Sequence, residues 1–264
     1  MPSYRGRTAL ITGASTGIGA AFAHALAGRG MNVVLVARTR DALEQLAADL
    51  TQRYQVAAVA LPADLSQPGA ALALVAELDG QALEIDMLLN NAGFGLHGAF
   101  EALTLDQQLN ELQVNTAALV ALTHALAPRM LSRASGTIIN IASTLAFQPD
   151  PYMAVYGATK AFVLSFTAAL AEEYRGRGVR VLALCPGATA TPFYRRSGGE
   201  ATFNRMRMRT PEDVVATGLR ALEGDQVVAI DGVRNRLLFG FLAPLPKAVS
   251  ARILGRALGP RQRP

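Results

Sequence analysis

The stretch Thr8-Ala-Leu-Ile-Thr-Gly-Ala-Ser-Thr-Gly-Ile-Gly19 decides the fold, because an apolar run passes directly into closely spaced glycines. Thr8–Ile11 predicts a buried strand, and the helical pattern of Ala20–Ala27 begins immediately after the glycines. Glycine lets the backbone turn sharply and lets another group approach it closely. This stretch therefore predicts a strand, a tight turn and a helix, which is the first unit of a parallel sheet.

The alternation of strand and helix continues along the chain. Apolar, strand-like runs follow at Val33–Ala37, Val56–Leu61, Met87–Leu89, Thr137–Ile141, Val179–Leu184 and Val227–Ile230. Helical periodicity lies between them at Asp41–Arg53, Ala70–Leu78, Leu105–Leu126, Ala154–Tyr174 and Glu212–Leu222. Strands that are apolar on both faces and separated by helices indicate a parallel sheet covered on each side. The sequence predicts an α/β fold with a single doubly wound parallel sheet of Rossmann type.

The composition fits one large core in a reducing compartment. The chain has 264 residues, of which 51% are hydrophobic, and Cys185 is its one cysteine. No internal disulfide is possible, so we expect a cytoplasmic protein. We expect no secretory signal, because no apolar segment follows the charged start Met1–Arg7 before the first strand. No apolar run approaches the ~20 residues of a membrane-spanning helix.

The positive charge is concentrated at the C-terminus. Residues 232–264 contain seven Lys or Arg and no acids, whereas residues 1–231 contain 18 basic and 20 acidic residues. A nucleic-acid-binding body would carry basic residues across a folded face, so we expect no nucleic-acid partner. We predict a catalytic domain over residues 1–231 and a basic, partly apolar extension over residues 232–264 that packs on the domain or on a partner subunit.

The glycine turn predicts a nucleotide site. Glycines let the backbone approach a pyrophosphate, whose charge then meets the positive end of the following helix. Arg38 follows the second strand, where an acid would bind the ribose hydroxyl of NAD. A guanidinium instead suits a 2′-phosphate. We therefore predict NADP(H) in preference to NAD(H), with a solvated Arg38 as the alternative.

Five ordered motifs resemble the short-chain dehydrogenase/reductase family over about residues 5–231. They are the Thr-Gly-x-x-x-Gly-x-Gly loop, Asn90-Asn91-Ala92-Gly93, Ser143, Tyr156-x-x-x-Lys160 and Pro186-Gly187. The resemblance implies a nicotinamide cofactor held by Thr12, Gly13, Ser15, Thr16, Gly17, Ile18, Gly19, Asp64, Asn91, Ala92, Gly93, Tyr156, Lys160, Pro186, Gly187, Thr189 and Thr191. It implies a catalytic set of Asn115, Ser143, Tyr156 and Lys160. It also implies a homodimer or homotetramer.

The chemistry of this set explains the residue types. Tyr156 and Lys160, four apart on one predicted helix, lie on the same face. A free tyrosine has a pKa of about 10. We expect the Lys160 cation and, in the oxidised complex, the positive nicotinamide to lower the pKa of Tyr156, so that it acts as general acid and base. Ser143 would orient the substrate oxygen. The resemblance implies that Asn115 connects Lys160 to solvent through water, and we expect no metal.

Two segments are predicted to set specificity. Residues 189–209 interrupt the alternation and carry three aromatic residues and five arginines, so we predict a lid over the site. The arginines suit an acidic substrate, an acyl carrier or coenzyme A, or they are simply solvated.

His97 follows the Asn-Asn-Ala-Gly turn and either lies at the edge of the substrate pocket or is structural.

The extension leaves three interpretations open. Its apolar stretch Leu237–Pro246 covers a substrate pocket, forms a subunit interface, or lies weakly on an anionic membrane surface. The favoured function is a reversible, NADP(H)-dependent reductase of a hydrophobic ketone or aldehyde, such as a 3-oxoacyl, steroid-like or xenobiotic ketone. The alternatives are a non-catalytic dinucleotide sensor on the same fold and a peripheral membrane protein that acts through its tail.

Overall fold

The computed structural model describes residues 4–199, 208–242 and 245–258. Within these residues the strands form a seven-stranded sheet in the order β3-β2-β1-β4-β5-β6-β7, and every neighbouring pair is parallel. The strands are β1 (Thr8–Thr12), β2 (Asn32–Ala37), β3 (Ala58–Pro62), β4 (Met87–Asn90), β5 (Gly136–Ile141), β6 (Val179–Cys185) and β7 (Val228–Ile230). The predicted doubly wound parallel sheet is confirmed.

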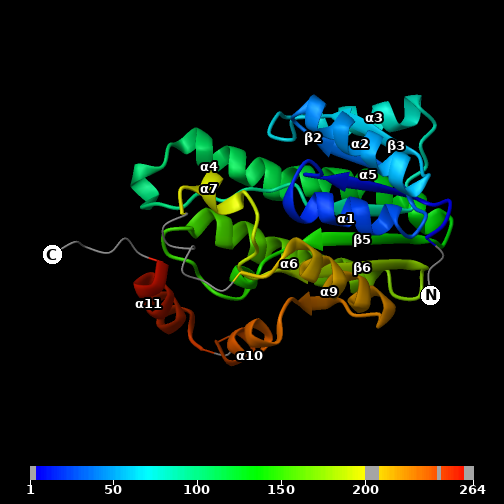
Figure 1. Ribbon diagram of the computed structural model, residues 1–264. Helices are drawn as coiled ribbons and strands as arrows, with labels where there is room; N and C mark the ends of the chain where they lie inside the picture. The colour runs from blue at the N-terminus through cyan, green and yellow to red at the C-terminus, as the bar shows by residue number, and fades with distance from the viewer. Residues whose placement is uncertain (1–3, 200–207, 243–244, 259–264) are drawn as a thin grey trace.

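Helices cover both faces of the sheet (Figure 1). The long ones are α1 (Gly17–Ala27), α2 (Arg40–Tyr54), α3 (Ala70–Gly80), α5 (Ala118–Ser132), α6 (Ala154–Glu173) and α9 (Pro211–Glu223). Buried side chains of α1, α2 and α9 pack in one core cluster, and those of α3, α5 and α6 pack in another. The sheet therefore has two separate apolar layers, as in other doubly wound folds.

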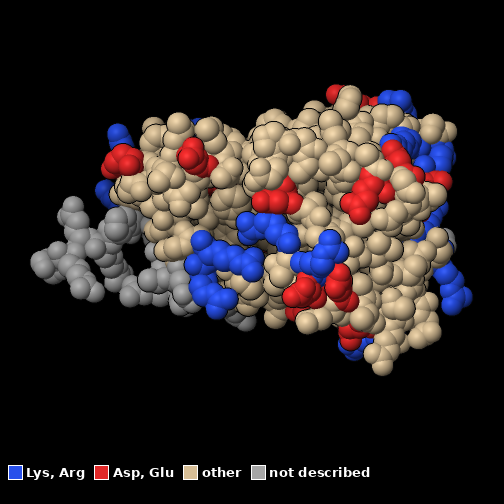
Figure 2. Space-filling model, turned by 90° about the horizontal axis from the view of Figure 1, so that it is seen from above, with Lys and Arg blue, Asp and Glu red and all other residues tan. Residues whose placement is uncertain are grey.

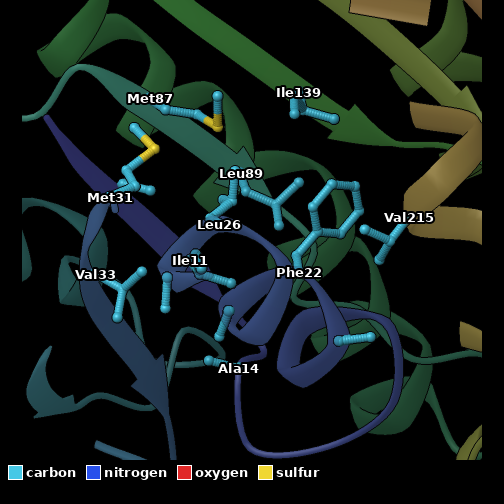
Figure 3. Packing of buried hydrophobic residues seen from close by; sticks show 14 of the residues in the cluster. Ile11, Ala14, Phe22, Leu26, Met31, Val33, Met87, Leu89, Ile139 and Val215 are labelled. Carbon is cyan, nitrogen blue, oxygen red and sulfur yellow. The ribbon is translucent and has the colours of Figure 1, made fainter. Parts of the chain in front are cut away.

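Successive residues of each strand feed the two layers alternately. Ile11 of β1 belongs to the first cluster together with Phe22 and Leu26 of α1, as Figure 3 shows. Its neighbour Leu10 points to the other face and packs in the second cluster. This alternation follows from the two-residue period of a strand, and it explains why both neighbours must be apolar.

The helix expected over Leu105–Leu126 is interrupted by a π-helical turn. The structure has α4 (Leu105–Leu112), the π-helical η2 (Gln113–Ala117) and α5, which continues to Ser132. Such a turn accommodates one extra residue in a helix and is frequent at functional sites. Hydrophobic periodicity does not signal it, because the apolar face continues through the turn.

Short helices beyond one end of the sheet form a cover (Figure 1). They include α7 (Phe193–Ser197) in the predicted lid, together with α10 (Val233–Leu242) and α11 (Lys247–Leu258) in the C-terminal extension. Phe239 of α10 and Ser250 of α11 are buried. The lid residues Phe203, Arg205 and Arg207 lie outside the described residues.

Contrary to the expectation from sequence that no apolar run approaches this length, one described helix, α6, is long and apolar enough to cross a membrane by length and composition alone. It packs against β6 in the domain and carries Tyr156 and Lys160. The helix is therefore described as a core helix of the domain, since core helices can have the same length and apolar composition as membrane-spanning ones.

Candidate active site

The site lies at the point where the order of the sheet reverses. β1 pairs with β2 on one side and with β4 on the other, so the chain runs outward from β1 to β2 and β3 and then crosses back past β1 to β4. A crevice forms beyond the carboxyl ends of the strands at such a switch point. The structure has a cavity of about 1200 Å³ there, lined by residues from the glycine turn, the strand ends, α6, α7 and α10. This volume exceeds that of most small-molecule sites.

The glycine turn leaves no room for side chains. Gly13 and Gly17 have positive φ angles of 65° and 60°. A Cβ on Gly13 would lie 2.8 Å from Asn91 Nδ2, and one on Gly17 would lie 2.9 Å from Thr191 Cγ2. A Cβ on Gly19 would collide with the Gly13 carbonyl oxygen. The turn therefore presents bare backbone to the cavity at the N-terminus of α1, which fits a pyrophosphate.

Thr12 and Asn91 hold this turn from behind. The Thr12 hydroxyl accepts hydrogen bonds from the backbone amides of Asn91 at 3.0 Å and Ala92 at 2.9 Å. Asn91 Nδ2 in return donates to the Thr12 and Gly13 carbonyls at 2.9 and 3.1 Å. The structure thus places Thr12 and Gly19 behind the cavity wall, whereas the other predicted cofactor-binding residues line the cavity.

Arg38 and Asp64 lie at the same end of the cavity. Both line it, and the Asp64 carboxylate accepts hydrogen bonds from the Ser66 amide at 3.1 Å and the Ser66 hydroxyl at 2.8 Å. Burial pushes the pKa of Asp64 upward, but the Ser66 hydrogen bonds and the Arg38 charge outweigh it and lower the pKa below its usual value. Asp64 therefore remains an acceptor, and Arg38 supplies a cation beside it.

The predicted catalytic residues lie together at the other end. Tyr156, Lys160 and Ser143 are buried, and all three line the cavity. Lys160 Nζ lies 5.7 Å from the centre of the Tyr156 ring and donates a hydrogen bond to the Ile141 carbonyl at 2.8 Å. The Ser143 hydroxyl accepts a hydrogen bond from the Leu145 amide at 3.1 Å. β5, the turn after it and α6 thus bring a phenol, an ammonium and a hydroxyl together.

The expected lowering of the tyrosine pKa is wrong for the protein alone. Burial raises the pKa of Tyr156 above its usual value, and the hydrogen bond with Ser143 opposes this only in part. Burial also lowers the pKa of Lys160 to about 8, against the opposing influence of Glu111. Removal from water disfavours both charged forms, which outweighs the attraction between them. Tyr156 is therefore a protonated acid near neutral pH.

Asn115 lies outside the cavity wall but beside the catalytic pair. It occupies the π-helical turn, where its Nδ2 donates to the Phe94 carbonyl at 2.8 Å and to Thr159 Oγ1 at 3.1 Å. Asn115 Oδ1 and Lys160 Nζ both lie within 3.4 Å of the position that a Cβ on Gly93 would take. Gly93 therefore leaves a small space between the two polar groups.

An apolar wall lies next to Tyr156, and the sequence predicted only part of it, through the aromatic lid and the apolar stretch of the extension. The rings of Tyr156 and Phe193 are 5.3 Å apart, and a Cβ on Gly95 would lie within 3.0 Å of both side chains. The wall is completed by Leu145, Met153, Leu238, Phe239 and Leu254. These residues come from separate segments without a shared motif, so no signal in the sequence groups them.

His97 and the lid arginines have limited contact with the cavity. His97 is not among the described residues that line it, and its backbone amide donates to the Ser197 carbonyl at 2.9 Å. Of the described arginines, Arg38, Arg196, Arg209 and Arg234 line the cavity. Figure 2 shows basic side chains gathered around a hollow on one face. The described residues include no group of three His, Cys, Asp or Glu suited to a metal ion.

Asp150 is a buried acid in the loop before α6. It is 3% exposed, neither carboxylate oxygen has a hydrogen-bond partner among the described residues, and a Cβ on Gly157 would collide with it. Burial raises the pKa of Asp150 to about 8, against the opposing charge of Lys247. The folded protein therefore keeps this carboxyl group protonated at neutral pH.

We expect Asp150→Asn to flatten the dependence of stability on pH. Unfolding returns the pKa of Asp150 to about 4, so the unfolded chain releases a proton that the folded chain keeps until about pH 8. The stabilising contribution is complete below about pH 4 and is lost as pH rises towards 8. In urea unfolding, the free energy of unfolding of the wild type should fall by about 3 kcal/mol between about pH 5 and pH 8. The fall should be smaller in the variant.

The matched control for this variant is Asp106→Asn, because Asp106 is exposed on α4. It should leave the pH dependence as in the wild type. The same slope of stability against pH in Asp150→Asn and in the wild type would contradict the assignment of a protonated Asp150.

The fold and the site together define a class of protein. The cavity has a turn of bare backbone at the switch point of the sheet, and it also holds a buried tyrosine, lysine and serine. This arrangement is suited to hydride exchange with a dinucleotide. The model of the short chain dehydrogenase family matches residues 7–200. The chain belongs to this family, whose members are oxidoreductases that bind nicotinamide dinucleotides.

Individual relatives agree with this assignment. The chain is 34% identical over 190 residues to a very-long-chain 3-oxoacyl-CoA reductase of Bos taurus, an alignment that covers 70% of the chain and 60% of the relative. The chain thus matches less than two thirds of the length of this relative and of a similar one from Gallus gallus.

Two solved structures match over more of the chain. A short-chain dehydrogenase from Sphingobium yanoikuyae in complex with NADPH has a TM-score of 0.81 and 35% identity, with coverage of 92% of this chain and 97% of the other. A bulky-bulky ketone specific alcohol dehydrogenase from Comamonas testosteroni has a TM-score of 0.76 and 31% identity, covering 92% and 96%.

Proposed function

We propose that the protein is an NADP(H)-dependent oxidoreductase that reduces a ketone or aldehyde and, in reverse, oxidises an alcohol. The observation that carries the proposal is the presence of Tyr156, Lys160 and Ser143 in one cavity with the glycine turn. The cradle fits a dinucleotide, because its glycines exclude side chains and Arg38 and Asp64 lie where the adenosine half would bind. The bound nicotinamide would supply or accept the hydride.

The chain's own residues supply the proton and hold the carbonyl oxygen. The Ser143 hydroxyl donates a hydrogen bond to this oxygen and stabilises its growing negative charge. Tyr156 donates its phenolic proton to the same oxygen, which gives the alcohol. Lys160, anchored by the Ile141 carbonyl, keeps a positive charge beside the phenolate that remains. In alcohol oxidation the same groups act in the opposite order.

We propose NADP(H) as the preferred cofactor. Arg38 lines the cavity just after β2, and the strand ends in Val36 and Ala37 rather than in an acidic residue. The structural relative from Sphingobium yanoikuyae is complexed with NADPH. A guanidinium at this position binds a 2′-phosphate by donating two parallel hydrogen bonds to its oxygens.

We propose a hydrophobic substrate. The wall beside Tyr156 is apolar, and α10 and α11 contribute Leu238, Phe239 and Leu254 to it. These contacts support a role of the extension in covering the substrate end of the cavity, one of the three roles that the sequence left open. Relatives named for 3-oxoacyl-CoA and for bulky ketones fit such a wall.

The test of this function is a panel of ketones, aldehydes and 3-oxoacyl thioesters, followed by the loss of NADPH absorbance. Turnover of at least one carbonyl class that is absent in Tyr156→Phe supports the proposal. Tight NADPH binding without turnover of any class would favour the dinucleotide sensor instead.

The role of the extension leads to a prediction about Leu254. Leu254→Ala should raise KM for a long apolar ketone about tenfold or more, with a smaller effect on a short one, because burial of such a side chain contributes about 1.5–3 kcal/mol. Ile253→Ala is the matched control, since Ile253 is 47% exposed and does not line the cavity. Equal KM changes in both variants would show that α11 does not shape the pocket.

The outer face of the extension remains available for a further contact. Leu237 and Val249 are exposed there and do not line the cavity. We propose that this face packs against a second copy of the chain, in line with the expected homodimer or homotetramer. Light scattering would measure the oligomeric state, and salt-sensitive binding to anionic vesicles by a monomer would favour the membrane surface.

A further inference from the structure

A second, smaller cavity lies behind the catalytic pair. Its volume is about 20 Å³, and it is formed by parts of the α4 region and of the loop that leads into α6. Its lining consists of Leu96, Gly98, Phe100, Leu103, Gln108, Glu111, Tyr152, Ala154 and Val155. Phe100 is 64% exposed, so the cavity reaches close to the surface. Such a volume holds about one water molecule.

Two buried oxygen atoms belong to residues that line this cavity. Gln108 Oε1 and Glu111 Oε1 have no hydrogen-bond partner among the described residues. The Gln108 amide orientation is fixed, because its Nε2 donates to the Phe100 and Leu103 carbonyls at 3.3 and 3.2 Å. Two acceptors without donors are costly in the protein interior, and a water molecule carries the two donors that would satisfy them.

Glu111 lies between this cavity and the active site. It is 1% exposed, and the Leu96 amide donates a hydrogen bond to its carboxylate. Burial raises the pKa of Glu111 to about 7, and the Leu96 hydrogen bond and the Lys160 charge oppose the rise. The ionisable groups that face it from neighbouring elements are Lys160 and Tyr156 of α6, together with Tyr152 of the loop before α6.

Burial shifts the proton affinities of the two groups toward each other. It raises the pKa of Glu111 and lowers that of Lys160, and each group influences the titration of the other. Transfer of a proton between them therefore costs less free energy than between the same groups in water. Glu111 also stands one helical turn before Asn115, which lies beside Lys160 across the space at Gly93.

We propose that Glu111, with a water molecule held between it and Gln108, forms a proton-exchange branch that restores the proton of the catalytic pair from the side of the small cavity. The inference rests on the proposed function. Glu111 acts through Lys160 and touches neither substrate nor cofactor.

The proton balance of one reduction closes. Tyr156 gives its proton to the carbonyl oxygen and becomes a phenolate, which takes a proton from the Lys160 ammonium. Neutral Lys160 takes a proton from the Glu111 carboxylic acid through water. The Glu111 carboxylate then takes one proton from solvent through the small cavity, so one solvent proton is consumed for each carbonyl reduced. Alcohol oxidation releases one proton along the same route.

The first test compares single and repeated turnovers. Glu111→Gln keeps the size of the side chain but cannot carry a proton. The first reduction should therefore proceed at the wild-type rate, while steady-state kcat falls about 100-fold, the lower end of the effect of losing a proton-transfer group. A burst of one product equivalent should appear. Glu111→Asp should restore much of kcat, and Glu101→Gln, an exposed acid in the same region, should behave as wild type.

The second test measures the carboxyl group directly. Difference infrared spectroscopy of the wild-type protein should show a buried carboxylic acid band that disappears around pH 7 and is absent from Glu111→Gln, whereas the Asp150 band should persist to about pH 8 in both proteins. Both spectra are taken without substrate, so failure of the proposed function would leave this measurement valid. Thermal melting and NADPH binding of each variant check that it is folded.

Two outcomes would overturn the inference. One is an unchanged steady-state kcat and pH profile in folded Glu111→Gln. The other is a Glu111 carboxylate that stays ionised down to about pH 5, because such a group has no proton to pass on. Loss of the first turnover together with the later ones would assign Glu111 to the chemical step or to structure, and would also refute the branch.

Discussion

Tyr156→Phe is expected to lower kcat for carbonyl reduction by about three orders of magnitude, while NADPH still binds. The phenylalanine ring preserves the packing against Phe193, but it removes the hydroxyl that donates the proton. General acid catalysis typically contributes about 10²–10⁴ in rate. The residual rate should lose its dependence on a tyrosine-like ionisation at high pH, because the raised pKa of Tyr156 no longer governs it.

The measurement is stopped-flow NADPH oxidation together with fluorescence titration of NADPH. Tyr174→Phe is the matched control, since Tyr174 caps the far end of the same helix. Substantial turnover in Tyr156→Phe would show that another group supplies the proton, and loss of NADPH binding would show that the variant had damaged the cavity instead.

The second large effect is expected for Arg38→Ala. The affinity for NADPH should fall about 10–100-fold, which corresponds to the loss of one or two charge-assisted hydrogen bonds of about 1.5–3 kcal/mol in total. The affinity for NADH should change less than about twofold, because NADH has no 2′-phosphate to lose. The ratio of the two dissociation constants, measured by isothermal titration, reports the contact.

Arg40→Ala is the control for this prediction. Arg40 is exposed two residues further on, pairs with Glu44 and does not line the cavity. It carries the same charge, so a general loss of positive potential would affect both variants equally. Equal weakening of NADPH and NADH by Arg38→Ala would place the guanidinium away from the phosphate.

The sheet and the cofactor cradle were predictable because their signals are local. The run Thr8–Ile11 is apolar on both faces, as a central parallel strand requires, and it passes directly into glycines that need positive φ angles. Tyr156 and Lys160 share a helix face through their spacing alone. In these cases one short segment determines both the geometry and the chemistry.

Other features depend on segments that meet only in the folded chain. The π-helical turn at Asn115 leaves no mark on the apolar periodicity, and the wall that includes Leu145 and Leu254 joins residues more than a hundred positions apart. The rise in the pKa of Tyr156 is another example. The sequence shows the neighbouring cation, but only the structure shows how completely both groups are removed from water.

Arg209 connects the two covers of the cavity. Its Nε lies 2.6 Å from the buried Asp231 carboxylate at the start of the extension. Its backbone bonds the chain at the start of the lid, through the Ala188 carbonyl at 2.9 Å and the Ala190 amide at 2.8 Å. The predicted lid and the chain that leads into the C-terminal helices are therefore tied to the same residue. A substitution of Arg209 would act at once on both segments that line the cavity.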